Sequence, residues 1–258
     1  NCQRGGPGLG TIQPSQGDYF QACKGGGHGD FHMIVLAPNS VQEMHDFVAD
    51  GFDLAFKYRN PAMILADGAI GQMMEKVVLA PQRPRHTNEE IAEECKAWAA
   101  CGKSADRERN VVTSLELKSE VMEQINLRLQ AKYKALEENE VRYETIDCDD
   151  ADYVIVAFGS SARICSATVE MARAEGLKVG LLRPITLYPF PKKAIADLAK
   201  RGVKGFLSAE LNAGQMVEDV RLAVNGTAPV AHYGRQGGMM FAPDEVLNAL
   251  KEKLINNK

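Results

Sequence analysis

The last hundred residues alternate short apolar runs with helical segments, and this alternation constrains the fold more than any other feature of the sequence. The apolar runs are continuous, and glycines or prolines separate them from the helical segments. Continuous apolar strands between helices are typical of a parallel sheet covered by helices on both faces. The predicted strands begin at Tyr153, Lys178, Gly205 and Pro229. Residues 151–258 are therefore predicted to form a complete, doubly wound α/β domain.

Glycines and prolines mark the helix ends in this region. Gly176 and Gly202 follow two of the helical segments, where glycine commonly ends a helix. Pro191 and Pro243 precede two others and suit a first helical position. The pattern predicts helices over 161–175, 191–200 and 214–224, and a last helix that begins at Pro243.

Residues 1–80 show only one β-α-β unit. A strand is predicted over 31–37 and another over 62–66, with a helix between them that opens on a capping box of Ser40 and Glu43. Two strands cannot form a stable parallel sheet alone, because both faces and both edges need cover. The segment is therefore expected to be a partial α/β domain, truncated at its N-terminal side.

Residues 81–150 differ from both neighbours, with prolines, dense charge and no strand-like run. We expect a helical connector. Its main helix is predicted to open on a capping box of Thr113 and Glu116. The apolar face of this helix, which we expect to pack on a neighbouring surface, comprises Val121, Met122, Ile125, Leu129, Tyr133 and Leu136.

Composition excludes several functional classes. The chain has 258 residues and a formal charge of −4, which gives no basic surface for nucleic acid. No apolar run reaches the roughly 18 residues that a membrane span needs. The cysteines are scattered without C-x-x-C spacing, which predicts reduced thiols in the cytoplasm and neither a metal site nor an iron–sulfur cluster on this chain. They are Cys2, Cys23, Cys95, Cys101, Cys148 and Cys165.

Three short motifs resemble nucleotide sites and are rejected. Gln13 stands where a dinucleotide fingerprint starting at Gly8 needs its third glycine. The stretch 101–104 ends like a phosphate-binding loop but follows a helix-like segment. The turn at Gly159 follows a strand and opens a helix, so it can either bind an anion or simply cap the helix, and we favour the simple cap.

A glycine-rich stretch, residues 3–31, interleaves glycine with residues that must pack, which predicts an ordered binding loop rather than a linker. Arg4 lies in it at the expected carboxyl end of a strand, where open α/β sheets bind their ligands. A guanidinium there can pair with a carboxylate, or it can be an ordinary surface arginine, and the sequence leaves both readings open. His28 and His32 lack metal-ligand spacing and are expected to be structural.

Seven motifs together resemble the α subunit of thiamine-diphosphate-dependent 2-oxoacid:ferredoxin oxidoreductases. They occur in the same order over nearly the whole chain, and the form of the first is most similar to the 2-ketoisovalerate branch. The motifs are RGGPGLGTIQPSQGDYFQA, GGGHGD, IVLAP, DGAIGQM, FGSSAR, LRPITLYPFP and ELNAGQM.

The resemblance implies a three-part chain. Its parts are a partial pyrimidine-binding domain over 1–80, a connector over 81–150 and a transketolase C-terminal-like domain over 151–258. It also implies oxidative decarboxylation of a 2-oxoacid to acyl-CoA and CO2, with electrons passed to ferredoxin. Thiamine diphosphate and Mg²⁺ are then shared with a β subunit, and iron–sulfur clusters lie on other subunits. The glutamate that activates the cofactor would lie outside this sequence, so the chain alone is expected to be inactive.

The resemblance assigns three residues to the substrate. Arg4 matches the family arginine that binds the substrate carboxylate, while Thr11 and Gln13 would line the pocket for the rest of the substrate. Two alternatives stay open. One is a 2-oxoglutarate-specific member of the same family, and the other is a non-catalytic binding or assembly module.

Overall fold

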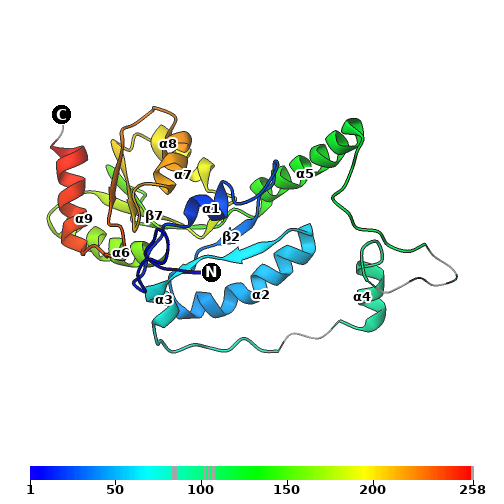
Figure 1. The fold of residues 1–258 in the computed structure, drawn as a ribbon. Helices are drawn as coiled ribbons and strands as arrows, with labels where there is room; N and C mark the ends of the chain where they lie inside the picture. Colours follow the sequence, from blue (N-terminus) through cyan, green and yellow to red (C-terminus); the bar gives the residue numbers. More distant parts are fainter. Residues whose placement is uncertain (83–85, 101–102, 104, 106–107, 257–258) are drawn as a thin grey trace. The chain divides into compact units, whose positions relative to one another are not determined.

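A computed structural model describes residues 1–82, 86–100, 103, 105 and 108–256. The chain divides into two compact units (Figure 1). The first combines residues 1–78 with 130–258, and the second comprises residues 79–129. The first unit therefore brings both ends of the sequence into one body.

A five-stranded sheet forms the centre of the first unit, in the order β10-β9-β6-β7-β5. Four of its strands are mutually parallel, and β5 pairs antiparallel with β7 at one edge. This confirms the predicted parallel sheet. The strands are β5 (Tyr143–Ile146), β6 (Tyr153–Val156), β7 (Val179–Pro184), β9 (Gly205–Glu210) and β10 (Val230–Gly234).

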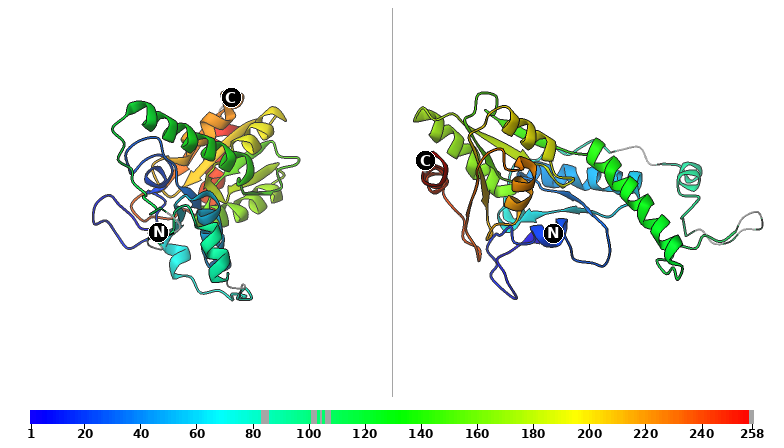
Figure 2. Two further views of the ribbon diagram at one scale, coloured as in Figure 1. Left: turned by 90° about the vertical axis from the view of Figure 1, so that its right-hand side faces the viewer. Right: turned by 90° about the horizontal axis from the view of Figure 1, so that it is seen from above.

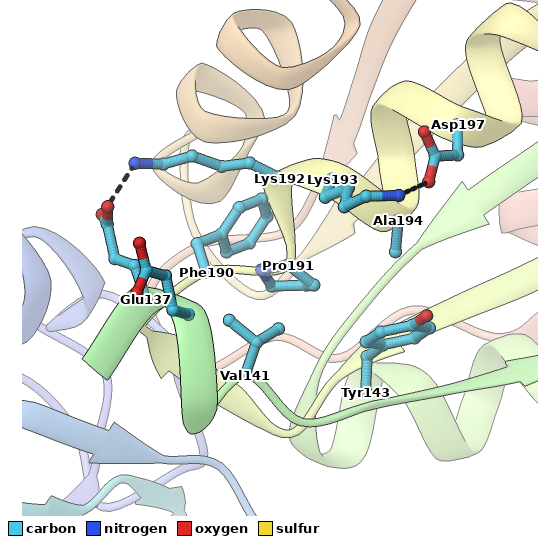
Figure 3. Close-up of a pocket in the computed structure, with 10 residues that line it drawn as sticks. Glu137, Val141, Tyr143, Phe190, Pro191, Lys192, Lys193, Ala194 and Asp197 are labelled. Atoms are coloured by element: carbon cyan, nitrogen blue, oxygen red, sulfur yellow. Dashed lines mark hydrogen bonds and ion pairs between the residues drawn. The ribbon is translucent and has the colours of Figure 1, made fainter. Parts of the chain in front are cut away.

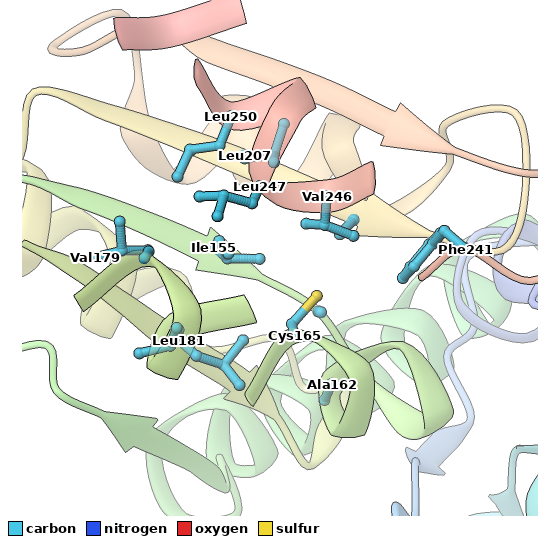
Figure 4. Packing of buried hydrophobic residues seen from close by; sticks show 14 of the residues in the cluster. Ile155, Ala162, Cys165, Val179, Leu181, Leu207, Phe241, Val246, Leu247 and Leu250 are labelled. Carbon is cyan, nitrogen blue, oxygen red and sulfur yellow. The ribbon is translucent and has the colours of Figure 1, made fainter. Parts of the chain in front are cut away.

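Helices cover both faces of this sheet. Helices α6 and α9 pack together on one face, and α7 and α8 pack together on the other (Figures 1 and 2). On the first face, Ile155, Leu181 and Leu207 of the sheet bury their side chains against Cys165 of α6 and Leu247 of α9 (Figure 4). The helices are α6 (Gly159–Ala174), α7 (Lys192–Lys200), α8 (Met216–Val224), α9 (Pro243–Leu250) and the terminal π-helical turn η1 (Lys251–Ile255).

The first 78 residues add two small sheets. Strand β1 pairs with β4, while β3, β2 and β8 form a three-stranded sheet. The predicted cap of α2 is confirmed, since Ser40 Oγ accepts a hydrogen bond from Glu43 N. The elements are β1 (Cys2–Gln3), α1 (Tyr19–Cys23), β2 (Ile34–Leu36), α2 (Val41–Tyr58), β3 (Ala62–Ile64), β4 (Ala66–Asp67), α3 (Gly68–Gln72) and β8 (Thr186–Tyr188).

Strand β8 comes from the C-terminal half of the sequence and pairs antiparallel with β2. Beside it, Arg183 at the end of β7 is buried and donates from Nη2 to both carboxylate oxygens of Glu43, at 2.7 Å each. A strand pair and a charged hydrogen-bonded pair therefore join the first 78 residues to the C-terminal half of the sequence.

Two expectations for residues 81–150 are wrong. Helix α5 is Ser119–Asn139, so the capping box of Thr113 and Glu116 does not open it. Thr113 Oγ1 instead accepts from Leu115 N, and Glu116 from Lys118 N, which are local bonds that compete with helix formation. Strand β5 forms where no strand-like run was seen, because it is an edge strand whose side chains are mostly exposed.

The apolar stripe on α5 is only partly buried. Tyr133 and Leu136 are buried, Met122, Ile125 and Leu129 are half-buried, and Val121 is exposed. The second unit contains the short helix α4 (Asn88–Glu94), which Thr87 caps. The stretch 101–104 lies outside the described residues, apart from Lys103.

The division of the chain at residues 80 and 150 stays a prediction. Over the described ranges, every helix is too short or too polar to cross a membrane.

Candidate functional site

The glycine loop, residues 4–13, closes on itself. Gly5 N donates to Gln13 O at 2.9 Å, and Thr11 N donates to Gly5 O at 2.8 Å. Gly10 has a φ of +55°, and a Cβ at that position would lie 1.8 Å from Gly5 O. Only glycine fits there, so at this position the glycine content of the motif follows from the closure of the loop.

Arg4 lies at the neck of the glycine loop and is exposed. Its Nη1 donates to Leu9 O and, at 3.3 Å, to Thr11 O. Among the described residues, no carboxylate lies within ion-pair distance of this guanidinium. Its positive charge is therefore available to a carboxylate from outside the chain, which it can bind with two parallel hydrogen bonds.

Thr11 and Gln13 lie on the same loop and are exposed as well. Thr11 Oγ1 accepts from Gln13 N at 3.3 Å and donates to Gly237 O at 3.4 Å. The structure thus brings the three predicted substrate residues together on one exposed loop. Their assignment to the substrate stays a prediction.

Behind the glycine loop lies the anchor segment, residues 14–20, which is held by buried hydrogen bonds. Gln16 is fully buried and makes three of them with its side chain. Its Nε2 donates to Phe158 O at 2.8 Å, and its Oε1 accepts from Ser161 Oγ at 2.7 Å and from Leu211 N at 3.0 Å. One amide therefore joins the segment to the start of α6 and to the end of β9.

The segment after β9 binds the anchor segment from the other side. Gln215 Oε1 accepts from Phe20 N at 2.8 Å, and its Nε2 donates to Gly17 O at 2.7 Å. Tyr19 is buried and donates to Asp219 Oδ2 at 2.5 Å, and burial raises the pKa of its phenol well above the usual range. The start of α1 is consequently fixed to α8 through hydrogen bonds rather than through apolar contact alone.

Glu210 fixes the start of α8. Its carboxylate is fully buried and accepts from Gln215 N, Met216 N and Val217 N at 2.7–3.1 Å. It also accepts from Ser208 Oγ at 2.8 Å. A carboxylate at a helix N-terminus satisfies unpaired N–H groups and interacts favourably with the helix dipole. The motif ELNAGQM therefore builds the start of α8 and the support of the anchor segment.

Asp67 occupies the start of two helices at once. Its Oδ1 accepts from Ala69 N and Ile70 N of α3, and its Oδ2 accepts from Ser160 N and, at 2.5 Å, from Ser160 Oγ of α6. The N-terminus of α6 thus already holds a carboxylate of this chain. The Gly159 turn opens α6 as expected, but the N-cap residue Phe158 makes no side-chain cap, and the carboxylate of Asp67 takes that place.

Sequence reasoning missed Gln16 and Asp67 as residues that position the loop. Asp67 carried a usable signal, because it follows a strand and precedes a glycine and a short helical segment, which is where an N-cap is expected. Gln16 carried none, because its partners lie about 140 and 195 residues away.

A pocket of about 350 Å³ lies elsewhere on the first unit, between the end of α5 and the start of α7 (Figure 3). Its floor is apolar, but its two lysines are already paired. Lys192 contacts Glu137 at 3.2 Å, and Lys193 contacts Asp197 at 2.5 Å. The pocket includes none of the glycine-loop residues and presents no uncompensated charge to an acid.

No group of three or more His, Cys, Asp or Glu side chains converges among the described residues as metal ligands would. The buried carboxylates of Asp67 and Glu210 accept hydrogen bonds from N–H and O–H donors of their own chain. What the described part offers instead is an exposed loop with an unpaired guanidinium.

Family models match almost all of the chain. Residues 1–145 match "Pyruvate flavodoxin/ferredoxin oxidoreductase, thiamine diP-bdg", and residues 151–246 match "Pyruvate:ferredoxin oxidoreductase core domain II".

Curated relatives agree with the family models. The chain is 48% identical over 252 residues to the ketoisovalerate oxidoreductase subunit VorB of Methanothermobacter marburgensis, covering 98% of this chain and 69% of that protein. It is 33% identical over 273 residues to the 2-oxoglutarate synthase subunit KorA of Methanocaldococcus jannaschii, covering 97% of this chain and 72% of that protein.

A solved structure shows the same fold. It is the 2-oxoglutarate:ferredoxin oxidoreductase from Magnetococcus marinus with 2-oxoglutarate, coenzyme A and succinyl-CoA bound, with a TM-score of 0.77 at 24% identity. The match covers 98% of this chain and 47% of the solved chain. With two family models matched in order and a relative at 48% identity, the chain belongs to the thiamine-diphosphate-dependent 2-oxoacid:ferredoxin oxidoreductases and is a subunit of such an enzyme.

Proposed function

We propose that this subunit serves the oxidative decarboxylation of 2-ketoisovalerate to the corresponding acyl-CoA and CO2, with two electrons passed to ferredoxin. The substrate follows from similarity, because the relatives named for ketoisovalerate are 47–48% identical and those named 2-oxoglutarate synthase are 29–33% identical. The observation that carries the site is Arg4, an exposed guanidinium without a carboxylate partner among the described residues.

In this proposal Arg4 binds the substrate carboxylate with two hydrogen bonds. The bonds to Leu9 O and Thr11 O both come from Nη1, and rotation of the side chain frees that nitrogen for the substrate as well. Thr11 and Gln13, on the opposite strand of the same loop, then face the rest of the substrate. A planar guanidinium matches a carboxylate in a way that a lysine ammonium cannot, so the orientation of the 2-keto carbon depends on arginine at this position.

Thiamine diphosphate, when bound, supplies the carbanion that attacks the 2-keto carbon and the electron sink that permits loss of CO2. The β subunit is proposed to hold the diphosphate and Mg²⁺, since no group of three or more His, Cys, Asp or Glu side chains converges as metal ligands among the described residues. Iron–sulfur clusters are proposed to lie on other subunits, with ferredoxin as the final acceptor. The residues of this chain act by binding and orienting the acid.

We also propose the cytoplasm as the location of the complex. The five cysteines in the described ranges are all free thiols, which suits a reducing compartment.

The test is a substrate panel on the assembled complex. The full-length chain and its partner subunits are purified together, and reduction of a viologen dye is followed with coenzyme A and each of 2-ketoisovalerate, 2-oxoglutarate and pyruvate. The proposal predicts the highest kcat/KM for 2-ketoisovalerate. A preference for 2-oxoglutarate would move the subunit to the other branch of the family.

Thiamine diphosphate titrated into the same complex separates an enzyme from an assembly module. Saturable binding together with turnover supports the enzyme. Binding of the partner subunits without any 2-oxoacid turnover would support the assembly module.

A further inference from the structure

The loop between β10 and α9 packs against the glycine loop, although the two are more than 220 residues apart in sequence. A Cβ on Gly238 would lie 2.5 Å from Gln13 Cβ and 2.7 Å from Thr11 Oγ1. A Cβ on Gly5 would lie 2.6 Å from Gly237 C and 2.7 Å from Gly238 N. The two backbones are thus as close as glycine permits, and the contact falls on the two residues assigned to the substrate beyond its carboxylate.

The β10–α9 loop is itself firmly held. Arg235 forms an ion pair with Glu245 of α9 at 2.6 Å, and Gln236 Nε2 donates to Asn212 O at 3.5 Å. After Gly237 and Gly238 in the sequence, Phe241 is buried in the hydrophobic core of the first unit (Figure 4). Gly237 and Gly238 therefore form a fixed surface, and the glycine loop, residues 4–13, packs against it.

From these contacts we propose that Gly238 is a positioning residue for substrate selection, because its missing side chain sets where Thr11 and Gln13 stand. This inference rests on the proposed function and extends it to a second loop. Any side chain at Gly238 must push Gln13 and Thr11 away from the β10–α9 loop. The part of the pocket that receives the substrate tail would then change shape, while the guanidinium of Arg4 keeps its charge.

The test compares Gly238→Ala with Gly202→Ala in the assembled complex. Both glycines have positive φ, +94° and +102°, but a Cβ on Gly202 would meet nothing within 4 Å. The two variants share the backbone strain and differ only in the clash. For Gly238→Ala we expect KM for 2-ketoisovalerate to rise roughly tenfold with kcat nearly unchanged, and KM for pyruvate, whose tail is one methyl group, to rise less. Gly202→Ala should leave both KM values as they are.

Hydrogen exchange supplies a readout that does not depend on turnover. The amides of Gly5 and Thr11 close the glycine loop, and they should exchange faster in Gly238→Ala than in Gly202→Ala. Should Gly238→Ala fail to fold, Arg235→Gln provides a second variant. It removes the ion pair with Glu245 that holds the β10–α9 loop, without placing a side chain at Gly238. It should raise KM for 2-ketoisovalerate in the same direction by a smaller factor.

An equal rise of KM for both acids would overturn the proposal, because the loop would then be disturbed as a whole. Unchanged exchange at Gly5 and Thr11 would overturn it as well. If exchange increases but the wild-type complex oxidises no 2-oxoacid, the proposed function fails, and the substrate role of Gly238 fails with it.

Discussion

The glycine loop and the anchor segment are consecutive in sequence but differ in how the protein holds them. Residues 14–20 are tied to α6, β9 and α8 by hydrogen bonds from buried side chains, of which Gln16 makes three. Residues 4–13 are mostly exposed and closed mainly by their own backbone. The difference shows how a fixed base can present an adaptable loop. Changes in the loop should alter substrate use, and changes in the anchor should alter stability.

Arg4→Ala should give the largest effect. Loss of a charged hydrogen-bonded pair of about 2–4 kcal/mol corresponds to a fall of roughly 30- to 1000-fold in kcat/KM for every 2-oxoacid. Arg4→Lys should lose most of the same activity, because an ammonium cannot form the paired bonds. The melting temperature of the assembled complex should not change, since the side chain is exposed. Near-normal turnover in Arg4→Ala would return Arg4 to an ordinary surface arginine.

Gln16→Ala should do the reverse and act on stability. It leaves Ser161 Oγ and Leu211 N without this partner in a buried site, and it leaves Phe158 O with only its bond from Ala162 N. A loss of about 3 kcal/mol in the free energy of unfolding is expected, measured by denaturant titration. Gln13→Ala is the matched control, because this glutamine is exposed and its loss should change the free energy by less than about 0.5 kcal/mol. Equal stability of the two variants would contradict the division into a fixed anchor segment and an exposed glycine loop.

Gln13→Ala should instead change the order of preferred substrates. Replacement by alanine enlarges the space for the substrate tail, so the ratio of kcat/KM between 2-ketoisovalerate and 2-oxoglutarate should change roughly three- to tenfold. The measurement is the same dye assay with both acids. A uniform fall for both would place Gln13 near the carboxylate rather than the tail.

The smallest effect concerns pH. Burial lowers the pKa of His32, which stacks on Tyr188 with ring centroids 4.2 Å apart, and burial also lowers the pKa of His232. The unfolded chain therefore binds more protons than the folded chain between these lowered values and the usual value of about 6.5. Stability should be fully present above pH 6.5 and should decrease as the pH falls from 6.5 towards 5.

His32→Phe keeps a stacked ring without titration, so its melting temperature should depend less on pH over that range than that of the wild type. An unchanged dependence would show that His32 is not responsible.

Much of the fold could be predicted because its signals are local. Continuous apolar strands, the Ser40 cap, and glycines at positions 176 and 202 with φ of +81° and +102° act within a few residues of themselves. No local pattern predicts the edge strand β5 or the pairing of β8 with β2, because both depend on partners far along the chain.

The candidate site divides in the same way. Arg4 could be selected from its place in a glycine-rich loop after a strand. The buried network of Gln16, Asp67 and Glu210 could not be assembled from the sequence, because each side chain binds groups that only the folded chain brings together. Sequence therefore points to the residue proposed to bind the substrate more readily than to the buried residues that support its loop.

The most direct measurement of the central claim compares a charged and a neutral ligand on two forms of the complex. Inhibition constants are determined for 2-ketoisovalerate and for its amide. Each competes with another 2-oxoacid, and the wild-type complex is compared with Arg4→Ala. The wild type should bind the acid more tightly than the amide by roughly 30-fold or more, and Arg4→Ala should bind the two about equally. If Arg4→Ala keeps the preference for the acid, the carboxylate is bound elsewhere and the account of this loop is wrong.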